Sequence, residues 1–347
     1  MHDPANELRR IPLPRTPVNK MSAMRRASVD GIIRTVAQRN RAQITERKAM
    51  ILIAGGTGTL GRQVVRLLTA RGLEVRILTR DPARTEHERG DLVEIISGDV
   101  RDARAVERAV DGAQTVISAV QGFAGSAPAG PQVVDRQGNS NLIEAARAGA
   151  TEHFILMSIQ GAAPDHPMEL FRMKYLAEQE LKESGLAWTI IRPTAYMETW
   201  AALIGEPLLK SGRTQIFGRG DNPINFVSAY DVARFVELAV VDPAMRGEVV
   251  EVGGPENLSM NQVAHTFETV TGQFGKKSHV PLPMMRLMSV LMRPVNPTLA
   301  RQIQAGVVMD THDFSFDPSG TTRRYPTIPH TSLAEVVRRD YVDPMPE

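Results

Sequence analysis

Residues 50–61, which read MILIAGGTGTLG, decide how this chain folds. Met50–Ala54 is a short apolar run typical of a buried strand, and residues 60–71 carry apolar side chains at helical spacing. A glycine-rich turn stands between the two. This order of strand, glycine turn and helix predicts the first strand–helix–strand unit of a parallel sheet.

The turn contains two overlapping motifs, G-x-x-G-x-x-G and G-x-G-x-x-G. One glycine allows a tight turn out of the strand, one lets the backbone approach a diphosphate, and one lets the helix lie close to the sheet. The first amides of the helix then offer unpaired N–H groups to phosphate oxygens. We expect a dinucleotide here, and the alternative is a purely structural glycine turn. The residues predicted to hold the dinucleotide are Gly55, Gly56, Thr57, Gly58, Thr59, Leu60 and Gly61.

Short apolar runs continue to alternate with helical segments as far as residue 191. Further strands are expected at 75–78, 93–96, 115–119, 154–157 and 188–191. Helices are expected at 102–110, 132–148 and 168–184. Because parallel strands joined by helices are covered on both faces, the pattern predicts the α/β class with a doubly wound parallel (Rossmann) sheet.

The rhythm of the sequence changes after residue 191, where proline and glycine become frequent. Examples are FGRGDNPINF at 217–226 and VGGPENLS at 252–259. We therefore expect residues 49–191 to form the dinucleotide-binding core. Residues 192–347 are expected to form a smaller C-terminal lobe interleaved with the last strands of the sheet.

The charge of the chain is unevenly spread. Residues 1–48 hold 11 basic and 4 acidic side chains, whereas the remainder holds 30 basic and 35 acidic ones. We expect the basic segment to be a disordered tail; a docking arm and upstream sequence from a misplaced translation start are the alternatives. Residues 27–45 have the spacing of a short amphipathic helix.

Composition excludes several classes of protein. The chain has no cysteine, so it forms no disulfide and has no thiolate nucleophile. Its 42% hydrophobic and 23% charged residues are typical of globular proteins. No apolar run approaches the roughly 20 residues of a transmembrane helix. A slightly acidic body argues against nucleic-acid binding by the core. We expect a cytoplasmic monomer or homodimer without a metal site.

The end of the second strand bears on the choice of cofactor. An NAD site places an acidic residue about 20 residues after the glycine motif, where it holds the ribose 2′-hydroxyl. Here Arg80 lies 19 residues after Gly61, and Arg84 follows in the same loop. Because a guanidinium suits a 2′-phosphate, we predict NADP(H) in preference to NAD(H). Asp81 keeps NAD(H) open, since its carboxylate suits a ribose hydroxyl.

Two later strand ends complete the predicted cofactor site. Asp99 and Val100 follow the third strand, and Asp99 can accept from the adenine amino group or cap the helix beginning near Ala103. Ala119 and Val120 follow the fourth strand, where small or apolar residues let the cofactor cross the sheet edge.

Together these features resemble the short-chain dehydrogenase/reductase superfamily, and more narrowly its atypical, NmrA-like NAD(P)-binding branch. The resemblance covers about residues 50–270 and rests mainly on the glycine turn and five further segments. These segments are GDV at 98–100, HFILMS at 153–158, LAWTIIRPTAYMETW at 186–200, NPINFVSAYDVA at 222–233 and VVEVGGPENLSMNQVA at 249–264.

The resemblance also implies candidate catalytic residues. The usual members combine a serine after the fifth strand with a Tyr-x-x-x-Lys pair on the next helix. Ser158 and Lys174 match the serine and the lysine, whereas Leu170 stands where the tyrosine is expected. The usual proton donor is therefore missing. Lys174 is expected to hold the ribose or to act as the acid itself, and Tyr196 is a further candidate on the other side of the nicotinamide.

Three other segments have both functional and structural interpretations. His166 lies in a loop near the expected site, and the loop position alone also explains it. Residues 311–317, THDFSFD, are expected to form a strand with one polar face rather than a metal site. Residues 283–293, PMMRLMSVLMR, predict an adaptable apolar face. Core or dimer packing, a cleft for a flat hydrophobic substrate such as a quinone, and attachment to a membrane surface are all open.

Two classes of function follow. The first is an NADP(H)-binding oxidoreductase acting on a small carbonyl, enone or quinone, for which Lys174 and the C-terminal lobe argue. The second is a non-catalytic NADP(H) sensor or an assembly subunit with a bound dinucleotide, for which the missing tyrosine argues. Turnover with a panel of acceptors distinguishes the two.

Overall fold

A computed structural model describes residues 49–88, 90–125 and 129–343. These residues belong to one compact unit that begins at Ala49. The predictions made for residues 1–48, including the helix at 27–45, lie outside the described residues. None of the described helices is both long enough and apolar enough to cross a membrane.

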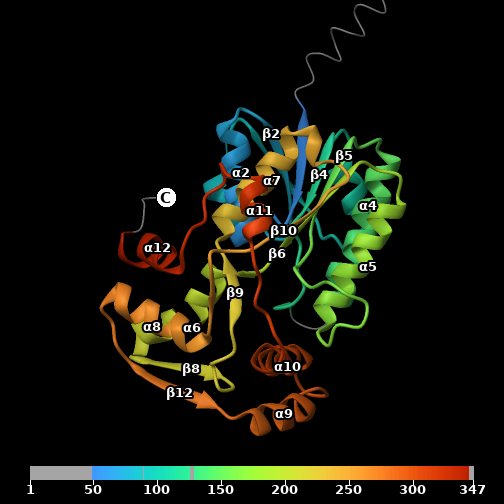
Figure 1. Ribbon diagram of the computed structural model, residues 1–347. Helices are drawn as coiled ribbons and strands as arrows, with labels where there is room; N and C mark the ends of the chain where they lie inside the picture. The colour runs from blue at the N-terminus through green and yellow to red at the C-terminus, as the bar shows by residue number, and fades with distance from the viewer. Residues whose placement is uncertain (1–48, 89, 126–128, 344–347) are drawn as a thin grey trace, which may run out of the picture. The chain divides into compact units, whose positions relative to one another are not determined.

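A seven-stranded sheet forms the centre of the fold, and all of its strands are parallel (Figure 1). Its order is β10-β6-β5-β4-β1-β2-β3. The strands are β1 (Met50–Ala54), β2 (Glu74–Thr79), β3 (Val93–Ser97), β4 (Thr115–Ser118), β5 (His153–Met157), β6 (Trp188–Pro193) and β10 (Val249–Val252). The predicted α/β class and doubly wound sheet are confirmed, and the order reverses beside β1, where the glycine turn begins.

Helices cover both faces of the sheet. On one face lie α2 (Thr59–Ala70) and α7 (Ala229–Val241), which pack on buried Ile53, Ile77 and Ile117. The other face is covered by three helices and contains the buried side chains of Leu52 and Phe154. These helices are α3 (Ala103–Val110), α4 (Asn139–Ala148) and α5 (Glu169–Glu183). Side chains of β1 thus alternate between the two cores, as the pleat of a strand requires.

The segment expected as one helix at 132–148 differs in its first half. Residues Gln132–Gly138 (η2) form a wider π-helical turn, and α4 begins only at Asn139. Such π turns inside helices are frequent at functional sites. Here the turn contains Asp135, whose side chain is completely buried. Two short 3-10 segments, η1 (Pro82–Glu88) and η3 (Pro243–Met245), lie elsewhere in the described chain.

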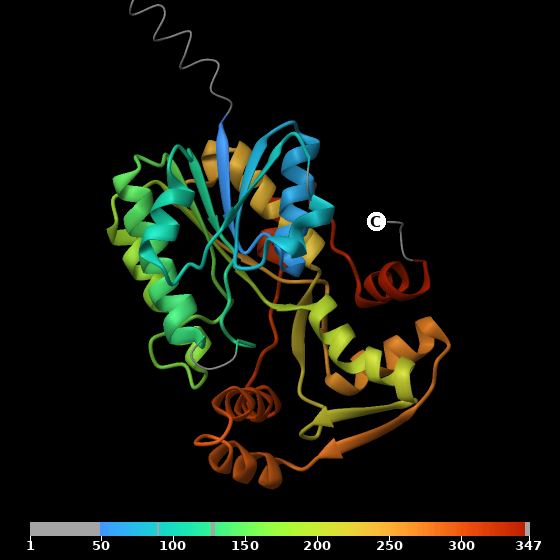
Figure 2. The ribbon, with the colours of Figure 1, turned by 180° about the vertical axis from the view of Figure 1, so that it is seen from behind.

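The remaining elements form a lobe beside the carboxyl ends of the strands (Figure 2). Its strands pair as β11-β9-β7 and β12-β8. They are β7 (Ala195–Tyr196), β8 (Arg213–Phe217), β9 (Ile224–Val227), β11 (Glu256–Leu258) and β12 (Lys276–Val280). Its helices are α6 (Met197–Ser211), α8 (Met260–Thr271), α9 (Leu282–Leu291) and α10 (Pro297–Thr311). Helix α11 (Ser319–Arg324) lies against β10 of the central sheet, and the last elements are α12 (Leu333–Val337) and η4 (Arg338–Val342).

The lobe and the sheet core are interleaved along the chain. Helix α7 and strand β10 follow residue 192 in sequence, yet α7 covers the sheet and β10 is its edge strand. The proposed division into residues 49–191 and 192–347 stays a prediction, since a single boundary residue does not describe these crossings.

Residues 311–317 do not form the expected strand, and only Phe314 makes an isolated bridge, to Ile224. Alternating phenylalanines in this segment instead pack separately, with Phe316 against Gly253.

Candidate functional site

A cavity of about 1540 Å³ lies at the carboxyl ends of the parallel strands, between these strand ends and the lobe. This is the place where open α/β sheets bind ligands. Its sheet side is formed by the loops after β1, β2, β3, β4 and β5, and its lobe side by α6 and α10. Apolar surface predominates over polar surface in its lining.

The glycine turn is packed tightly where it leaves β1 and where it enters α2. A Cβ at Gly55 would lie 2.6 Å from the carbonyl oxygen of Ala119, and Gly55 has a φ of +94°. A Cβ at Gly61 would lie 2.2 Å from the carbonyl oxygen of Gly55. Both positions therefore need glycine for the fold itself. Gly56 is buried, and a Cβ there would meet Ile77 at 2.9 Å. Unlike the other predicted glycines, it does not line the cavity.

Gly58 is different, because nothing in the protein requires a glycine there. Its φ of −84° and ψ of 172° suit any L-residue, and a Cβ at this position would lie 3.5 Å from its nearest neighbour, the Gly55 carbonyl oxygen. Gly58 is exposed and faces the cavity as the N-cap of α2. Helix α2 has no side-chain cap and no acidic residue in its first turn. Thr59, Leu60 and Gly61 therefore present the start of a helix that suits an anion.

Two arginines lie at the end of the cavity formed by β2. Arg80 and Arg84 are exposed and line the cavity, and the described residues give neither guanidinium an ion pair. Asp81 lies between them, and its Oδ1 accepts from the backbone N–H of Ala83 at 3.1 Å. One oxygen of the competing carboxylate is therefore engaged in a local turn, whereas both cations face the space where a phosphate would lie.

Asp99 also lines the cavity, but it does not cap a helix. The N-cap of α3 is Asp102, whose side chain accepts from the N–H of Arg104, so the capping interpretation of Asp99 is wrong. Asp99 instead binds the Arg101 guanidinium at 3.0 and 2.7 Å. That hydrogen bond, with a smaller contribution from the charge of Arg80, lowers the pKa of the Asp99 carboxyl. Its neighbours in the predicted cofactor set, Val100, Ala119 and Val120, line the cavity as well.

Lys174 is buried beneath the loop after β4. Its Nζ donates to the carbonyl oxygens of Val120 at 2.8 Å and Met157 at 2.9 Å, and lies 3.1 Å from Oδ1 of Asp135. Two of the three ammonium hydrogens are thus donated to carbonyl oxygens, whereas the contact with Asp135 is an ion pair in which Oδ1 receives no hydrogen bond. Asp135 receives a further bond from the Gly122 N–H at 2.8 Å. Burial raises the pKa of Asp135, and the charge of Lys174 opposes that rise.

The Lys174–Asp135 pair therefore connects three segments on the cofactor side of the cavity. It ties the loop after β4 to the end of β5 and to the π turn. Lys174 lines the cavity at its edge. Its predicted contact with the ribose stays a prediction, and in this arrangement two of its hydrogens are already donated to backbone carbonyls.

Ser158 belongs to a second buried network. Its hydroxyl donates to Oε1 of Glu178, and the same carboxylate binds Arg192 in a bidentate manner at 2.8 and 2.6 Å. Arg192 in turn reaches Glu251 on β10 at 3.3 Å. Because its only hydrogen is donated to Glu178, Ser158 is oriented to stabilise the ends of β5 and β6. Its predicted place as the catalytic serine stays a prediction.

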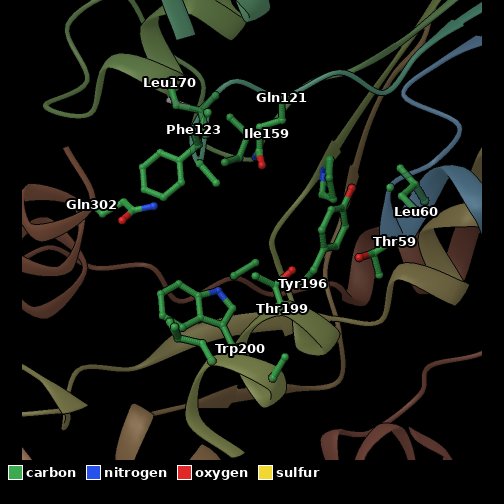
Figure 3. Close-up of a pocket in the computed structure, with 18 of the residues that line it drawn as sticks. Thr59, Leu60, Gln121, Phe123, Ile159, Leu170, Tyr196, Thr199, Trp200 and Gln302 are labelled. Carbon is green, nitrogen blue, oxygen red and sulfur yellow. The ribbon is translucent and has the colours of Figure 1, made fainter. Parts of the chain in front are cut away.

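Tyr196 lies between the cofactor side and the lobe. Figure 3 shows its ring beside Leu60 and Thr59 on one side and near Thr199 and Trp200 on the other. Burial, and to a smaller extent the charge of Glu198, raise the pKa of its hydroxyl. The phenol therefore stays protonated at neutral pH and can donate a hydrogen bond.

The far end of the cavity is an apolar chamber that the sequence did not reveal. Phe123 and Leu170 lie on one side and Trp200 on the other, and Gln302 of α10 enters between them (Figure 3). Trp200 packs edge-on against Phe226, with ring centroids 6.3 Å apart. Leu170, at the position where the resemblance to short-chain dehydrogenases predicts a tyrosine, is part of this wall. The only sequence signal was the change in composition after residue 191.

His166 does not line the cavity. Its ring stacks on Phe171 with a centroid separation of 3.9 Å, and its Nδ1 accepts from the Met168 N–H at 3.1 Å. Burial lowers its pKa. These contacts fit the structural interpretation of a loop histidine. Within the described ranges, no three His, Asp or Glu side chains converge as metal ligands.

Comparison with known proteins agrees with this geometry. Residues 55–243 match the model of a protein family described as NAD(P)H-binding. The chain is 30% identical over 225 residues to the NAD(P)H azoreductase of Xenophilus azovorans, which covers 65% of this chain and 74% of that protein. It is 29% identical over 237 residues to the photosystem II assembly factor Ycf39 of Cyanophora paradoxa, covering 68% and 73% of the two chains.

Among solved structures, the chain is similar to the NADPH-dependent quinone oxidoreductase QOR2 of Escherichia coli in complex with NADPH. The TM-score is 0.67 at 21% identity, and the match covers 84% of this chain and 100% of the other. At 21% identity, the similarity to this structure supports a shared fold alone.

Proposed function

The chain belongs to the NAD(P)H-binding family, and from that premise we propose that it is an NADP(H)-dependent oxidoreductase that reduces a flat, apolar acceptor, with quinones and enones as the leading class. The observation that carries the proposal is the continuity of the cavity. It runs without interruption from Gly58 and the α2 N-terminus to the chamber around Trp200. An anion-binding end and an apolar end in one space suit a dinucleotide and its acceptor.

The residues of the cofactor end fit NADP(H). The α2 N-terminus and the open face of Gly58 would hold the diphosphate, and Arg80 and Arg84 would hold the 2′-phosphate. NAD(H) remains the alternative, and Asp81 would then serve the ribose. Bound NADPH supplies a hydride, and the protein supplies orientation and electrostatics.

The missing tyrosine narrows the class of acceptor. Reduction of a simple ketone produces an alkoxide, which needs a nearby acid, and Leu170 removes the usual one. A quinone accepts a hydride to give a hydroquinone anion, which is far less basic and takes its proton from water. The protonated Tyr196 hydroxyl can donate a hydrogen bond to an acceptor oxygen. Quinone-like acceptors therefore suit this site better than simple ketones.

A non-catalytic sensor or assembly role is the second candidate. The observation in its favour is that Ser158 donates its hydroxyl hydrogen to Glu178, and that Lys174 donates to two backbone carbonyls and forms an ion pair with Asp135. The Cyanophora relative, described as an assembly factor, is a protein of this kind. We further propose that the chain acts in the cytoplasm as a monomer or homodimer on a small hydrophobic substrate.

One experiment separates the two candidates. NADPH consumption is measured with a panel of quinones, enones, azo dyes and simple ketones, alongside calorimetry of NADPH binding. We expect turnover with quinones and little with simple ketones. Tight NADPH binding without turnover on any acceptor would favour the sensor, and absence of NADPH binding would contradict both. A homodimer would be detected by light scattering in the same samples.

A further inference from the structure

Helix α9 is apolar on the side that faces away from the protein. Its inward residues are Met285 and Ser289, and the Met285 side chain packs against Gly306 of α10. Apart from Arg286, the large outward side chains of α9, together with Val295 just after it, are aliphatic or methionine, and between 37% and 76% of each is exposed. We call these residues the α9 patch: Met284, Leu287, Met288, Val290, Leu291 and Val295. Most exposed helices carry polar residues there, so an apolar outer face indicates a binding surface.

The surroundings of the patch are strictly basic. Between Glu268 and Asp310 the sequence contains no acidic residue, but it contains five lysines or arginines. Arg286 and Arg293 lie between the residues of the patch in sequence and are exposed, and neither has an ion pair among the described residues. Lys276, on the neighbouring strand β12, is exposed as well. Apolar and cationic side chains therefore share this stretch of the chain, which contains no acidic residue of its own.

We propose that the α9 patch docks the protein on the surface of an anionic lipid bilayer. A short helix with aliphatic side chains outward and arginines beside them lies in the interface of a bilayer, with its apolar side chains among the acyl chains and its cations at the headgroups. Each arginine near an anionic surface adds to the attraction. The charge complementarity between these arginines and anionic headgroups therefore favours a lipid bilayer as the binding partner of the patch.

Two other occupants fit less well. A symmetric dimer through this surface would bring Arg286 and Arg293 of one copy against the same residues of the other, because a two-fold interface pairs a patch with itself. No acidic residue of the segment would compensate. Protein interfaces are enriched in tryptophan, tyrosine and arginine at their energetic centres, and the α9 patch contains no aromatic residue.

Helix α10 connects the patch to the cavity, because α9 packs on α10 and α10 lines the cavity. Leu299, at the start of α10, is 37% exposed and lines the cavity, and Gln302, Ile303 and Gly306 of the same helix line it further in. Figures 1 and 2 show α9 packed on α10 at the lobe end of the molecule. A lipophilic acceptor could thus pass from the bilayer to the cavity along one helix. This consequence rests on the proposed function, whereas the docking itself does not.

The experiment measures binding of the full chain to vesicles of equal parts phosphatidylcholine and phosphatidylglycerol, with pure phosphatidylcholine vesicles as the neutral comparison. We expect sedimentation with the anionic vesicles only. Leu287→Asp with Val290→Asp should abolish the part of the binding due to α9. Arg286→Gln with Arg293→Gln should weaken it by roughly thirtyfold at low salt. The matched controls are Leu176→Asp with Val241→Asp, and Arg108→Gln with Arg147→Gln, all exposed positions elsewhere.

Because residues 1–48 are basic and present in every variant, a second readout reports on α9 alone. The chain has no cysteine, so Leu291→Cys or Leu176→Cys creates a single position for a polarity-sensitive fluorophore. We expect a blue shift and quenching by brominated lipid for the label at 291 and neither for the label at 176. Unchanged thermal midpoints and NADPH binding would show that the variants are folded.

Several results would overturn the proposal. These are equal binding to neutral vesicles, equal binding by the α9 and control variants, or an unshifted label at 291. Concentration-dependent dimers that Leu287→Asp dissociates, without any vesicle binding, would assign the patch to a second copy. Binding of polyglutamate but not of vesicles would assign it to an acidic protein. Failure of quinone turnover alongside successful docking would overturn only the proposed function.

Discussion

The two ends of the cavity are built by different means. At the cofactor end, the glycine turn and the α2 N-terminus come from one short stretch, residues 55–61, and the ends of the later strands add side chains such as those of Arg80 and Asp99. At the acceptor end, side chains from the loop after β4, from α5, α6 and α10 converge from segments far apart in sequence, such as those of Phe123 and Gln302. The centre of the cofactor end is therefore formed by a local backbone motif, whereas the shape of the acceptor end depends on how elements distant in sequence pack together.

The sharpest test of this difference is Gly58→Val. A valine suits the backbone angles at position 58 and has 3.5 Å of clearance for its Cβ, so we expect an unchanged thermal midpoint. It would occupy the approach path of the diphosphate, so NADPH affinity should fall by at least about a thousandfold, or about 4 kcal/mol. Calorimetry measures the affinity.

Two other glycine substitutions serve as controls for the Gly58→Val experiment. Gly320→Val, in open space on α11, should change neither stability nor affinity. Gly61→Val should unfold or strongly destabilise the chain, because its Cβ would lie 2.2 Å from the Gly55 carbonyl oxygen. NADPH binding retained by Gly58→Val would mean that the cofactor lies elsewhere.

Lys174 tests whether the cofactor end also depends on a buried side chain. Lys174→Ala leaves the Asp135 carboxylate buried without its cation, and we expect a loss of about 3–5 kcal/mol in the free energy of unfolding. Urea denaturation measures it. The double variant Lys174→Met with Asp135→Asn removes both charges and keeps an acceptor for the Gly122 N–H, so it should recover most of the loss. A stable Lys174→Ala protein that loses only turnover would instead make Lys174 a catalytic residue.

Arg80 distinguishes the two cofactors. Arg80→Ala should weaken NADPH binding by about 1.5–3 kcal/mol, because a charge-assisted hydrogen bond to the 2′-phosphate is lost, and leave NADH binding nearly unchanged. Calorimetry with both cofactors measures the difference. The matched control is Arg104→Ala, an exposed arginine on α3 away from the cavity. Equal affinity of the parent protein for NADPH and NADH would contradict the role of Arg80.

The contrast between local motifs and contacts of distant elements also explains which features the sequence could predict. Strands β1 to β6 and helices α2 to α5 were predictable because their apolar periodicity reports burial directly. The glycine turn was predictable because its chemistry is local. The Lys174–Asp135 pair was not, because Asp135 takes its buried position from a π turn that periodicity does not distinguish from an α-helix. Of the two roles predicted for Asp99, helix capping failed because Asp102, three residues later, is the N-cap of α3.

The acceptor end itself is tested by Trp200→Ala, the smallest effect we predict. The indole forms one wall of the chamber and is held by Phe226, so its loss should remove stacking area from a flat acceptor. We expect the KM for a quinone to rise roughly tenfold, or about 1.4 kcal/mol, with NADPH affinity unchanged. Trp200→Phe keeps an aromatic plane and should retain most of the acceptor binding. If Trp200→Ala weakened NADPH binding as much as quinone binding, the two ends of the cavity would not be separate sites, and the comparison would fail.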